Sequence, residues 1–134
     1  MPRERIFVDT SAWYAIIDKN DQDHSAAVAK IQLLSHPLVT SNYILDEILT
    51  LLKARFGSAT AISFGQKLWD QEVSALLRIT EEDERIAWEI FRQYPDKGFS
   101  FTDCTSFVLM ERLGINTAFA FDNHFAQYGK FLIL

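Results

Sequence analysis

Apolar residues along the chain follow two alternating patterns, short continuous runs and longer stretches with helical spacing. Residues 6–8 form a run short enough for a buried strand, whereas residues 42–55 have apolar side chains three and four positions apart, as on one helix face. The pattern predicts strands at 6–8, 37–40, 73–79, 117–121 and 131–134, and helices at 11–19, 23–34, 42–55, 59–70, from 81 onward and at 103–113. Because helices and strands alternate, the expected fold class is α/β with a central, largely parallel sheet.

Residues with strong preferences for helix ends mark several of these boundaries. Gly57 and Gly114 are expected to end the helices that precede them, because glycine readily adopts the conformation found after a last helical turn. Thr80 and Asp83 resemble a capping box at the start of a helix. Thr102 is expected to cap the helix over 103–113.

The composition indicates one globular domain over residues 1–134. The chain is 49% hydrophobic and 13% aromatic, which is enough for a substantial core. It has no apolar run of the roughly 20 residues that a membrane span needs, and residues 1–5 precede the first strand without an apolar signal region. The single cysteine, Cys104, excludes an internal disulfide framework and a cysteine-rich zinc site. These features lead us to expect a cytoplasmic protein with no membrane partner.

The charge balance is acidic. The net charge is −5, from 13 Lys and Arg against 18 Asp and Glu. This balance is mild evidence against tight, non-specific binding to nucleic acid, for which a basic surface is typical. Net charge is a sum over the whole molecule, however, and acids that hold divalent cations create a less negative local field. The charge therefore does not exclude an enzyme that hydrolyses nucleic acid.

Three aspartates fall where an α/β sheet places its ligand site. Asp9 directly follows the first predicted strand, Asp122 follows the predicted strand 117–121, and Asp103 begins a predicted helix. Ligands of open α/β sheets bind outside the carboxyl ends of the strands, so these side chains are candidates for one site. The alternative for each of them is an ordinary structural role, because aspartate is common in turns and at helix N-termini.

Glu47 is more informative, because it lies at the margin of a buried helix face. At about 100° per residue, it lies at the edge of the apolar arc that contains Ile44 and Ile48, whereas its neighbour Asp46 faces solvent. A carboxylate at the margin of a core needs compensation by a basic side chain or a metal. A structural salt bridge to Arg or Lys and a metal site are therefore both open.

Four converging carboxylates would repel one another, and hard divalent cations remove that penalty. Ligand sets made only of oxygen favour Mg²⁺ or Mn²⁺ over zinc. Such a site is typical of phosphodiester hydrolysis, in which the metal activates water and stabilises charge on the phosphate.

The segments that carry these acids resemble the PIN-domain family and, within it, the VapC-type toxins of bacterial toxin–antitoxin pairs. The resemblance extends over nearly the whole chain. It depends on four segments in this order: Phe7-Val8-Asp9-Thr10-Ser11-Ala12, Thr40-Ser41-Asn42-Tyr43-Ile44-Leu45-Asp46-Glu47-Ile48, Ser100-Phe101-Thr102-Asp103-Cys104 and Ala120-Phe121-Asp122-Asn123-His124-Phe125.

The resemblance implies a three-layer α/β/α sandwich and a Mg²⁺- or Mn²⁺-dependent endoribonuclease. It implies that Asp9, Glu47, Asp103 and Asp122 are the catalytic and metal-binding residues. It also implies that Ser11 lies beside the metal site and that Thr102 supplies a hydroxyl just before the third acid. The expected partners are an RNA substrate, a protein antitoxin and a second copy of the chain in a homodimer.

Several other interpretations remain at this stage. For His124 a structural role is favoured over a phosphate contact, and Cys104 is interpreted as a small core residue. A signalling receiver domain would need adjacent acids after its first strand, whereas Asp9 is followed by Thr10 and Ser11. A PIN fold that only binds RNA or protein, and a structure-specific DNA nuclease, are the other functional alternatives.

Overall fold

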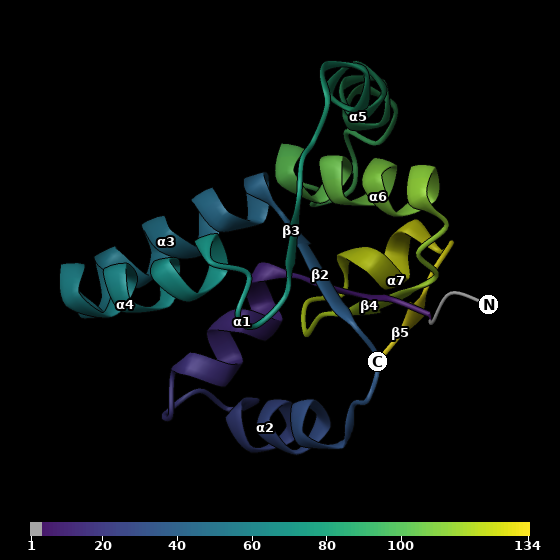
Figure 1. The fold of residues 1–134 in the computed structure, drawn as a ribbon. Helices are drawn as coiled ribbons and strands as arrows, with labels where there is room; N and C mark the ends of the chain where they lie inside the picture. Colours follow the sequence, from purple (N-terminus) through teal and green to yellow (C-terminus); the bar gives the residue numbers. More distant parts are fainter. Residues whose placement is uncertain (1–3) are drawn as a thin grey trace.

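A five-stranded parallel sheet forms the centre of the structure, a computed structural model that describes residues 4–134 (Figure 1). Residues 1–3, which belong to the segment expected to lack a signal, lie outside the described residues. The spatial order of the strands is β3-β2-β1-β4-β5, and every neighbouring pair is parallel. The strands are β1 (Ile6–Val8), β2 (Leu38–Ser41), β3 (Ala75–Leu77), β4 (Thr117–Phe119) and β5 (Leu132–Ile133).

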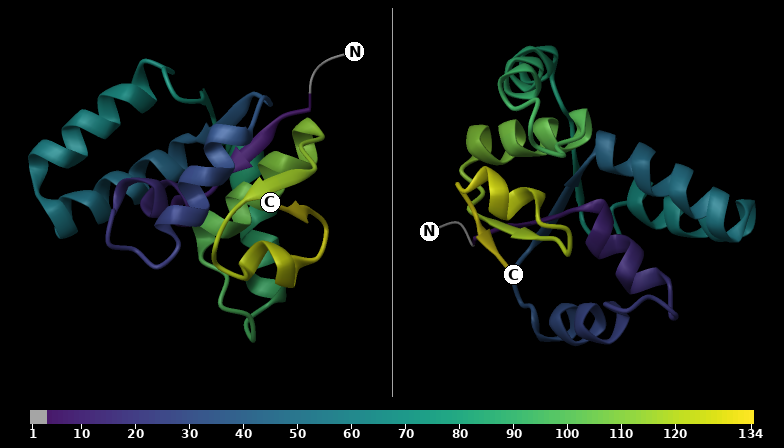
Figure 2. Two further views of the ribbon diagram at one scale, coloured as in Figure 1. Left: turned by 90° about the horizontal axis from the view of Figure 1, so that it is seen from below. Right: turned by 180° about the vertical axis from the view of Figure 1, so that it is seen from behind.

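Helices cover both faces of this sheet. Parallel strands connect through right-handed crossovers, so the helices between β1 and β3 lie on one face and the helices after β3 lie on the other (Figures 1 and 2). The first group is α1 (Thr10–Ile17), α2 (His24–Leu33), α3 (Asn42–Phe56) and α4 (Ser58–Trp69); the second is α5 (Glu81–Gln93), α6 (Phe101–Leu113) and α7 (His124–Tyr128). This arrangement confirms the expected α/β/α sandwich. Within residues 4–134, no helix has the length and apolar character that a membrane crossing requires.

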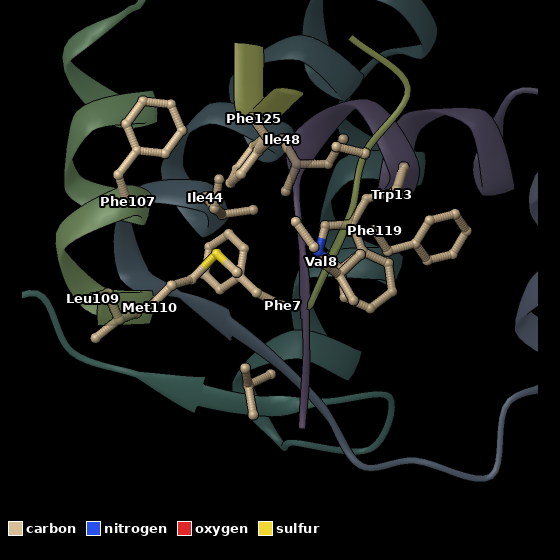
Figure 3. Close-up of a cluster of buried hydrophobic side chains, with 14 of the residues drawn as sticks. Phe7, Val8, Trp13, Ile44, Ile48, Phe107, Leu109, Met110, Phe119 and Phe125 are labelled. Carbon is tan, nitrogen blue, oxygen red and sulfur yellow. The ribbon is translucent and has the colours of Figure 1, made fainter. Parts of the chain in front are cut away.

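The core joins the two helical layers through the central strand. All three residues of β1 are buried, and Phe7 contributes a ring that no solvent reaches. Figure 3 shows side chains from β1, α3, α6, β4 and α7 converging on this region, among them Ile48, Phe107 and Phe125. Because β1 lies at the centre of the core, the position of Asp9, the residue that follows it, is fixed.

Most predicted boundaries are confirmed, with three corrections. Gly57 and Gly114 end α3 and α6 with positive φ angles of 91° and 67°. The expected cap at Thr102 is wrong, because Ser100 caps α6 and the helix begins at Phe101. The strands expected at 73–79 and 117–121 are shorter, and the five-residue helix α7 was not predicted.

Candidate active site

The carboxyl ends of β1 and β4 place the first and last acids side by side. Val8 pairs with Phe119 in the sheet, and the Asp9 N–H donates to the Phe119 carbonyl at 3.0 Å. The chain after β4 therefore passes next to Asp9. Asp122 lies three residues beyond the end of β4, not directly after it as the sequence pattern suggested.

Asp9 is nearly inaccessible and is held by the start of α1. It is the N-cap of that helix, and its Oδ2 accepts hydrogen bonds from the Ser11 N–H at 3.2 Å and the Ser11 Oγ at 2.7 Å. The same Ser11 hydroxyl accepts from the Phe121 N–H at 3.0 Å. One serine therefore connects the α1 N-terminus, the first acid and the loop that carries Asp122.

Asp103 is buried in the first turn of α6, where it completes a capping box. Its Oδ2 accepts from the Ser100 N–H at 2.9 Å, and the Ser100 Oγ accepts from the Asp103 N–H at 3.0 Å. The His124 Nδ1 lies 2.7 Å from the same Oδ2, without the alignment of a hydrogen bond. The His124 backbone N–H donates to Asp122 Oδ1 at 3.1 Å. His124 thus bridges the third and fourth acids.

One oxygen of each aspartate remains open. Among the described residues, the hydrogen bonds to Asp9 and Asp103 fall on Oδ2, and the bond to Asp122 falls on Oδ1. The second oxygen of each carboxylate is therefore available to a ligand. Protein hydrogen bonds that fix ligand orientation in this way are the usual support of a metal site.

Glu47 projects from the second turn of α3 into the same region. Ser41 caps α3 through a bond from the Ile44 N–H, which fixes the start of the helix at the end of β2. Glu47, half-buried, lines a cleft of about 610 Å³ together with Asp9, Ser11 and Asp122. Asp46, which is exposed, lies at the mouth of this cleft.

The electrostatics of the cleft disfavour four bare charges. Burial raises the pKa of Asp9 well above its ordinary value, and the neighbouring Asp122 and Asp103 raise it further against the hydrogen bonds from Ser11. The pKa of Asp103 is also raised, mainly by burial and in part by Asp122, although the Ser100 N–H and His124 oppose the shift. Burial and the neighbouring carboxylates therefore make Asp9 and Asp103 easier to protonate.

The pKa of Glu47 follows the same trend. Burial raises it, the Thr10 hydroxyl partly offsets the rise, and Asp103 and Asp122 add repulsion. Within residues 4–134, no Lys or Arg forms an ion pair with any of the four acids. The structural salt bridge considered for Glu47 is thus not present in the described part of the chain. The carboxylate oxygens of this cluster match the ligand preference of a hard divalent cation.

The geometry agrees with the comparison of the whole sequence. The profile of the PIN domain matches residues 6–131. The chain belongs to the PIN-domain family. VapC20 of Mycobacterium tuberculosis, a 23S rRNA-specific endonuclease, is 36% identical over 125 residues, which are 92% of this chain and 94% of VapC20. A VapC ribonuclease of Archaeoglobus fulgidus is 31% identical over 127 residues, 89% of this chain and 78% of that protein.

Two solved structures share the fold. The crystal structure of M. tuberculosis VapC20, described as a sarcin-ricin loop cleaving toxin, has a TM-score of 0.88 at 34% identity, with 93% of this chain and 95% of that one covered. VapBC2 from Rickettsia felis, bound to a DNA fragment from its promoter, has a TM-score of 0.72 and covers 97% of both chains. At 11% identity, that second likeness supports the fold alone.

His124 is half-buried and pairs with Asp103, which agrees with its structural interpretation, whereas Thr102 of this PIN domain differs from its interpretation in the sequence. His124, favoured as a structural residue, offers a nitrogen that lies within 4.8 Å of an oxygen of Asp103 and of Asp122, close enough for one ion to bind all three. Thr102 does not cap α6; its carbonyl accepts from the hydroxyls of Thr105 and Ser106. The short spacing from Asp122 to His124 was the available signal for the histidine.

Cys104 and Asp46 behave as the sequence indicated. Burial raises the pKa of the Cys104 thiol to about 12, so the thiol is not ionised at neutral pH and is not a nucleophile. Asp46 is exposed, on the solvent side of α3. Asp46 is thus more exposed than Glu47, as the helix geometry predicted, although both residues line the cleft.

Proposed function

We propose that this protein is a Mg²⁺- or Mn²⁺-dependent endoribonuclease whose metal ligands and catalytic residues are Asp9, Glu47, Asp103 and Asp122. One observation carries the proposal. Four acids from separate segments meet at the carboxyl edge of the sheet without a Lys or Arg partner among the described residues, and burial together with neighbouring carboxylates raises the pKa values of Asp9, Glu47 and Asp103. Such a cluster is costly to the fold unless it binds cations.

The residues present fit a hard divalent cation. Asp9, Asp103 and Asp122 each keep one oxygen open, and Glu47 reaches the same cleft from α3. A bound Mg²⁺ or Mn²⁺ supplies the Lewis acidity and the positive charge that phosphodiester hydrolysis requires. The protein's own contribution is orientation, in which Ser11 fixes Asp9.

His124 and Thr102 have supporting places in this proposal. His124 lies between Asp103 and Asp122, where it orients both carboxylates and can donate to a phosphate. Thr102 precedes Asp103 in the first turn of α6 and is half-buried. Both are assigned supporting places, because hard cations prefer carboxylate oxygens to an imidazole nitrogen or a neutral hydroxyl.

RNA is the substrate class that the relatives favour. VapC20 is described as specific for 23S rRNA and the A. fulgidus relative as a ribonuclease. At 36% identity over most of both chains, we extend this substrate class to the present protein and take the sarcin-ricin loop of 23S rRNA as the first candidate target. The biological role that follows is the toxin of a toxin–antitoxin pair.

The proposal is tested by incubation with total RNA, ribosomes and a sarcin-ricin loop oligonucleotide, each with Mg²⁺, Mn²⁺ or EDTA. We expect discrete RNA fragments with either metal and none with EDTA. DNA of the same sequence serves as the control for a structure-specific DNA nuclease. Cleavage that persists in EDTA, or RNA binding without any cleavage, would contradict the proposed function.

The proposed cellular partners follow from the same role. We expect a protein antitoxin that silences the cleft and a homodimer of the chain, in the cytoplasm. Expression of the protein alone in bacteria should arrest growth, and Glu47→Gln should abolish the arrest. Light scattering of the purified chain tests the homodimer, with twice the 15.4 kDa chain mass expected. A monomer at micromolar concentration would remove this expectation without affecting the proposed chemistry.

A further inference from the structure

An exposed aromatic surface lies on the C-terminal half of α5. Trp88, Phe91 and Tyr94 are all exposed, although large aromatic side chains usually bury most of their area. Together with Phe99 they line a hollow of about 370 Å³. We call these four residues the α5 platform. An exposed aromatic patch of this kind marks a binding surface.

The rings of the α5 platform are anchored to the fold. The Trp88 and Phe91 rings are nearly parallel, with centroids 5.8 Å apart and an interplanar angle of 21°. Phe91 meets Phe101 of α6 edge-on at 6.2 Å, and Tyr94 meets Phe99 at 5.8 Å. Trp88 is thus the outer member of a short stack whose inner member is fixed, which leaves it in position to extend the stack with another flat ring.

The platform is linked to the acid cluster through the buried ring of Phe99. The Phe99 ring packs against the His124 ring at 6.1 Å, and His124 touches Asp103. The backbone of the connecting segment also runs beside this histidine, since a Cβ atom at Gly98 would lie 3.5 Å from His124 Nε2. When a nucleic-acid chain has one phosphate at the acids, its neighbouring nucleotides lie on the side of the platform.

Two cations border the hollow, Arg92 and Lys97. Arg92 pairs with Glu89 at 2.8 Å, but both side chains are more than half exposed, so the pair is weak and can exchange for a phosphate. Asp96 and Glu89 are the acidic residues of the same segment. In residues 88–99 these two cations balance the two acids, so this segment is neutral in a chain with a net charge of −5 and places cations beside exposed rings, as nucleic-acid strands require.

We propose that the α5 platform binds unpaired nucleobases of the RNA substrate by stacking on Trp88 and Phe91, while Arg92 and Lys97 contact the adjacent phosphates. The inference rests on the proposed ribonuclease function and adds to it a place for the nucleotides beside the scissile bond. Stacking tolerates every base because each presents a flat face. The platform therefore contributes affinity and favours unpaired over paired RNA.

The test measures binding in Mg²⁺ with a fluorescein-labelled single-stranded RNA of about ten nucleotides, a length within the site sizes of such surfaces. All proteins carry Glu47→Gln so that the RNA stays intact, which a gel confirms. Trp69→Ala is the matched control: Trp69 is 52% exposed against 51% for Trp88, but the Arg78 guanidinium lies over its ring at 5.5 Å. We expect Trp88→Ala to raise the Kd roughly 5- to 140-fold, the range for one stacked base, and Trp69→Ala to leave it within about twofold.

A second arm uses RNA with one abasic position scanned along the strand. At one position, removal of the base should raise the Kd as much as Trp88→Ala does. The abasic RNA and the Trp88→Ala protein combined should raise the Kd little more than either change alone. Equal Kd values for Trp88→Ala and Trp69→Ala, or no measurable RNA binding, would overturn the inference. Light scattering also tests whether Trp88→Ala converts a dimer to a monomer while RNA binding stays normal. That result would overturn the inference and show that the platform contacts a second copy of the chain. Failure of cleavage by wild type would contradict the proposed function alone, because binding is measured separately.

Discussion

At the scale of single residues, Ser11 shows how a small side chain organises several backbone segments. Its hydroxyl donates to Asp9 Oδ2 at 2.7 Å and accepts from the Phe121 N–H at 3.0 Å. The first bond selects which Asp9 oxygen stays open, and the second holds the loop that leads to Asp122. Ser11 therefore positions two acids without a charge of its own.

Replacing Ser11 by alanine should remove both bonds. We expect Ser11→Ala to lower the RNA cleavage rate with Mn²⁺ roughly 10- to 100-fold, the usual effect of losing a residue that orients a ligand. The free energy of unfolding should fall by about 1–2 kcal/mol, because two hydrogen bonds are lost. Cleavage assays and urea unfolding give the two numbers.

Ser25→Ala, on the exposed side of α2, is the matched control and should change stability by less than about 0.5 kcal/mol. If Ser11→Ala cleaves RNA at the wild-type rate, the Asp9 orientation does not depend on this serine.

At the scale of elements, α5 and α6 are joined by a buried carboxylate. Arg112 Nε and Nη2 of α6 donate to the two oxygens of Asp83 at 2.8 Å each. Asp83 also completes a capping box with Thr80. Burial raises the pKa of Asp83, but the bonds from Arg112 and Thr80 outweigh it, so the pKa lies below its ordinary value. This contact fixes α6, which carries Asp103.

Asp83→Asn should therefore destabilise the fold. The variant keeps the shape and one acceptor but loses the charge, and we expect a loss of about 1–3 kcal/mol in urea unfolding, limited by the partial exposure of Arg112. Glu81→Gln, which removes an exposed pair with Arg85, should cost less than about 0.5 kcal/mol. Equal effects of the two variants would show that the buried contact adds nothing to stability.

The elements also show how far local sequence signals extend. Alternating apolar patterns predicted the five strands and six of the helices, because burial of one face leaves a periodic trace in the sequence. The start of α6 was misplaced although the signal was available: Ser100 and Asp103 have the same spacing as Thr80 and Asp83, and that spacing makes a capping box. Helix α7 has only five residues, too few for a periodic pattern.

For the site, the sequence predicted which acids are candidates but not how they are held. The angular position of each residue around the predicted helix distinguished Glu47 from Asp46, because adjacent positions on one helix face different surroundings. The proximity of His124 to Asp103 depends on contact between α6 and the start of α7, two helices that are packed together on one face of the sheet. Tertiary contacts of that kind have no local signal in the sequence.

At the scale of the whole molecule, the acid cluster lowers the stability of the folded state when its carboxylates are ionised. The pKa values of Asp9, Glu47 and Asp103 are raised in the folded protein. Between the ordinary carboxyl pKa of about 4 and these raised values, the folded state binds more protons than the unfolded state, so stability falls as pH rises through that range. Asp83 acts in the opposite direction, and its contribution is lost as pH falls below about 4.

We therefore expect the metal-free protein, in EDTA, to melt at a higher temperature near pH 5.5 than near pH 7.5. Mn²⁺ at a hundred times its dissociation constant should add about 2.7 kcal/mol at neutral pH, where the carboxylates are ionised. Glu47→Gln should be more stable than wild type without metal and should respond less to Mn²⁺, because one repelling charge and one ligand are gone. Melting curves of both proteins over pH would contradict the account if metal-free stability rose steadily from pH 5.5 to 7.5.

The central claim, that acids of the cleft bind a divalent cation and cleave RNA with it, is tested most directly by one comparison of adjacent residues. RNA cleavage rates with Mn²⁺ are measured for wild type, Glu47→Gln and Asp46→Asn, which change neighbouring carboxylates by the same chemistry. The account predicts a loss on the order of 10²–10³-fold for Glu47→Gln, as for the removal of one group that stabilises charge in the transition state, and a change within about twofold for the exposed Asp46→Asn. Equal losses in the two variants, or a folded Glu47→Gln protein with wild-type activity, would contradict it.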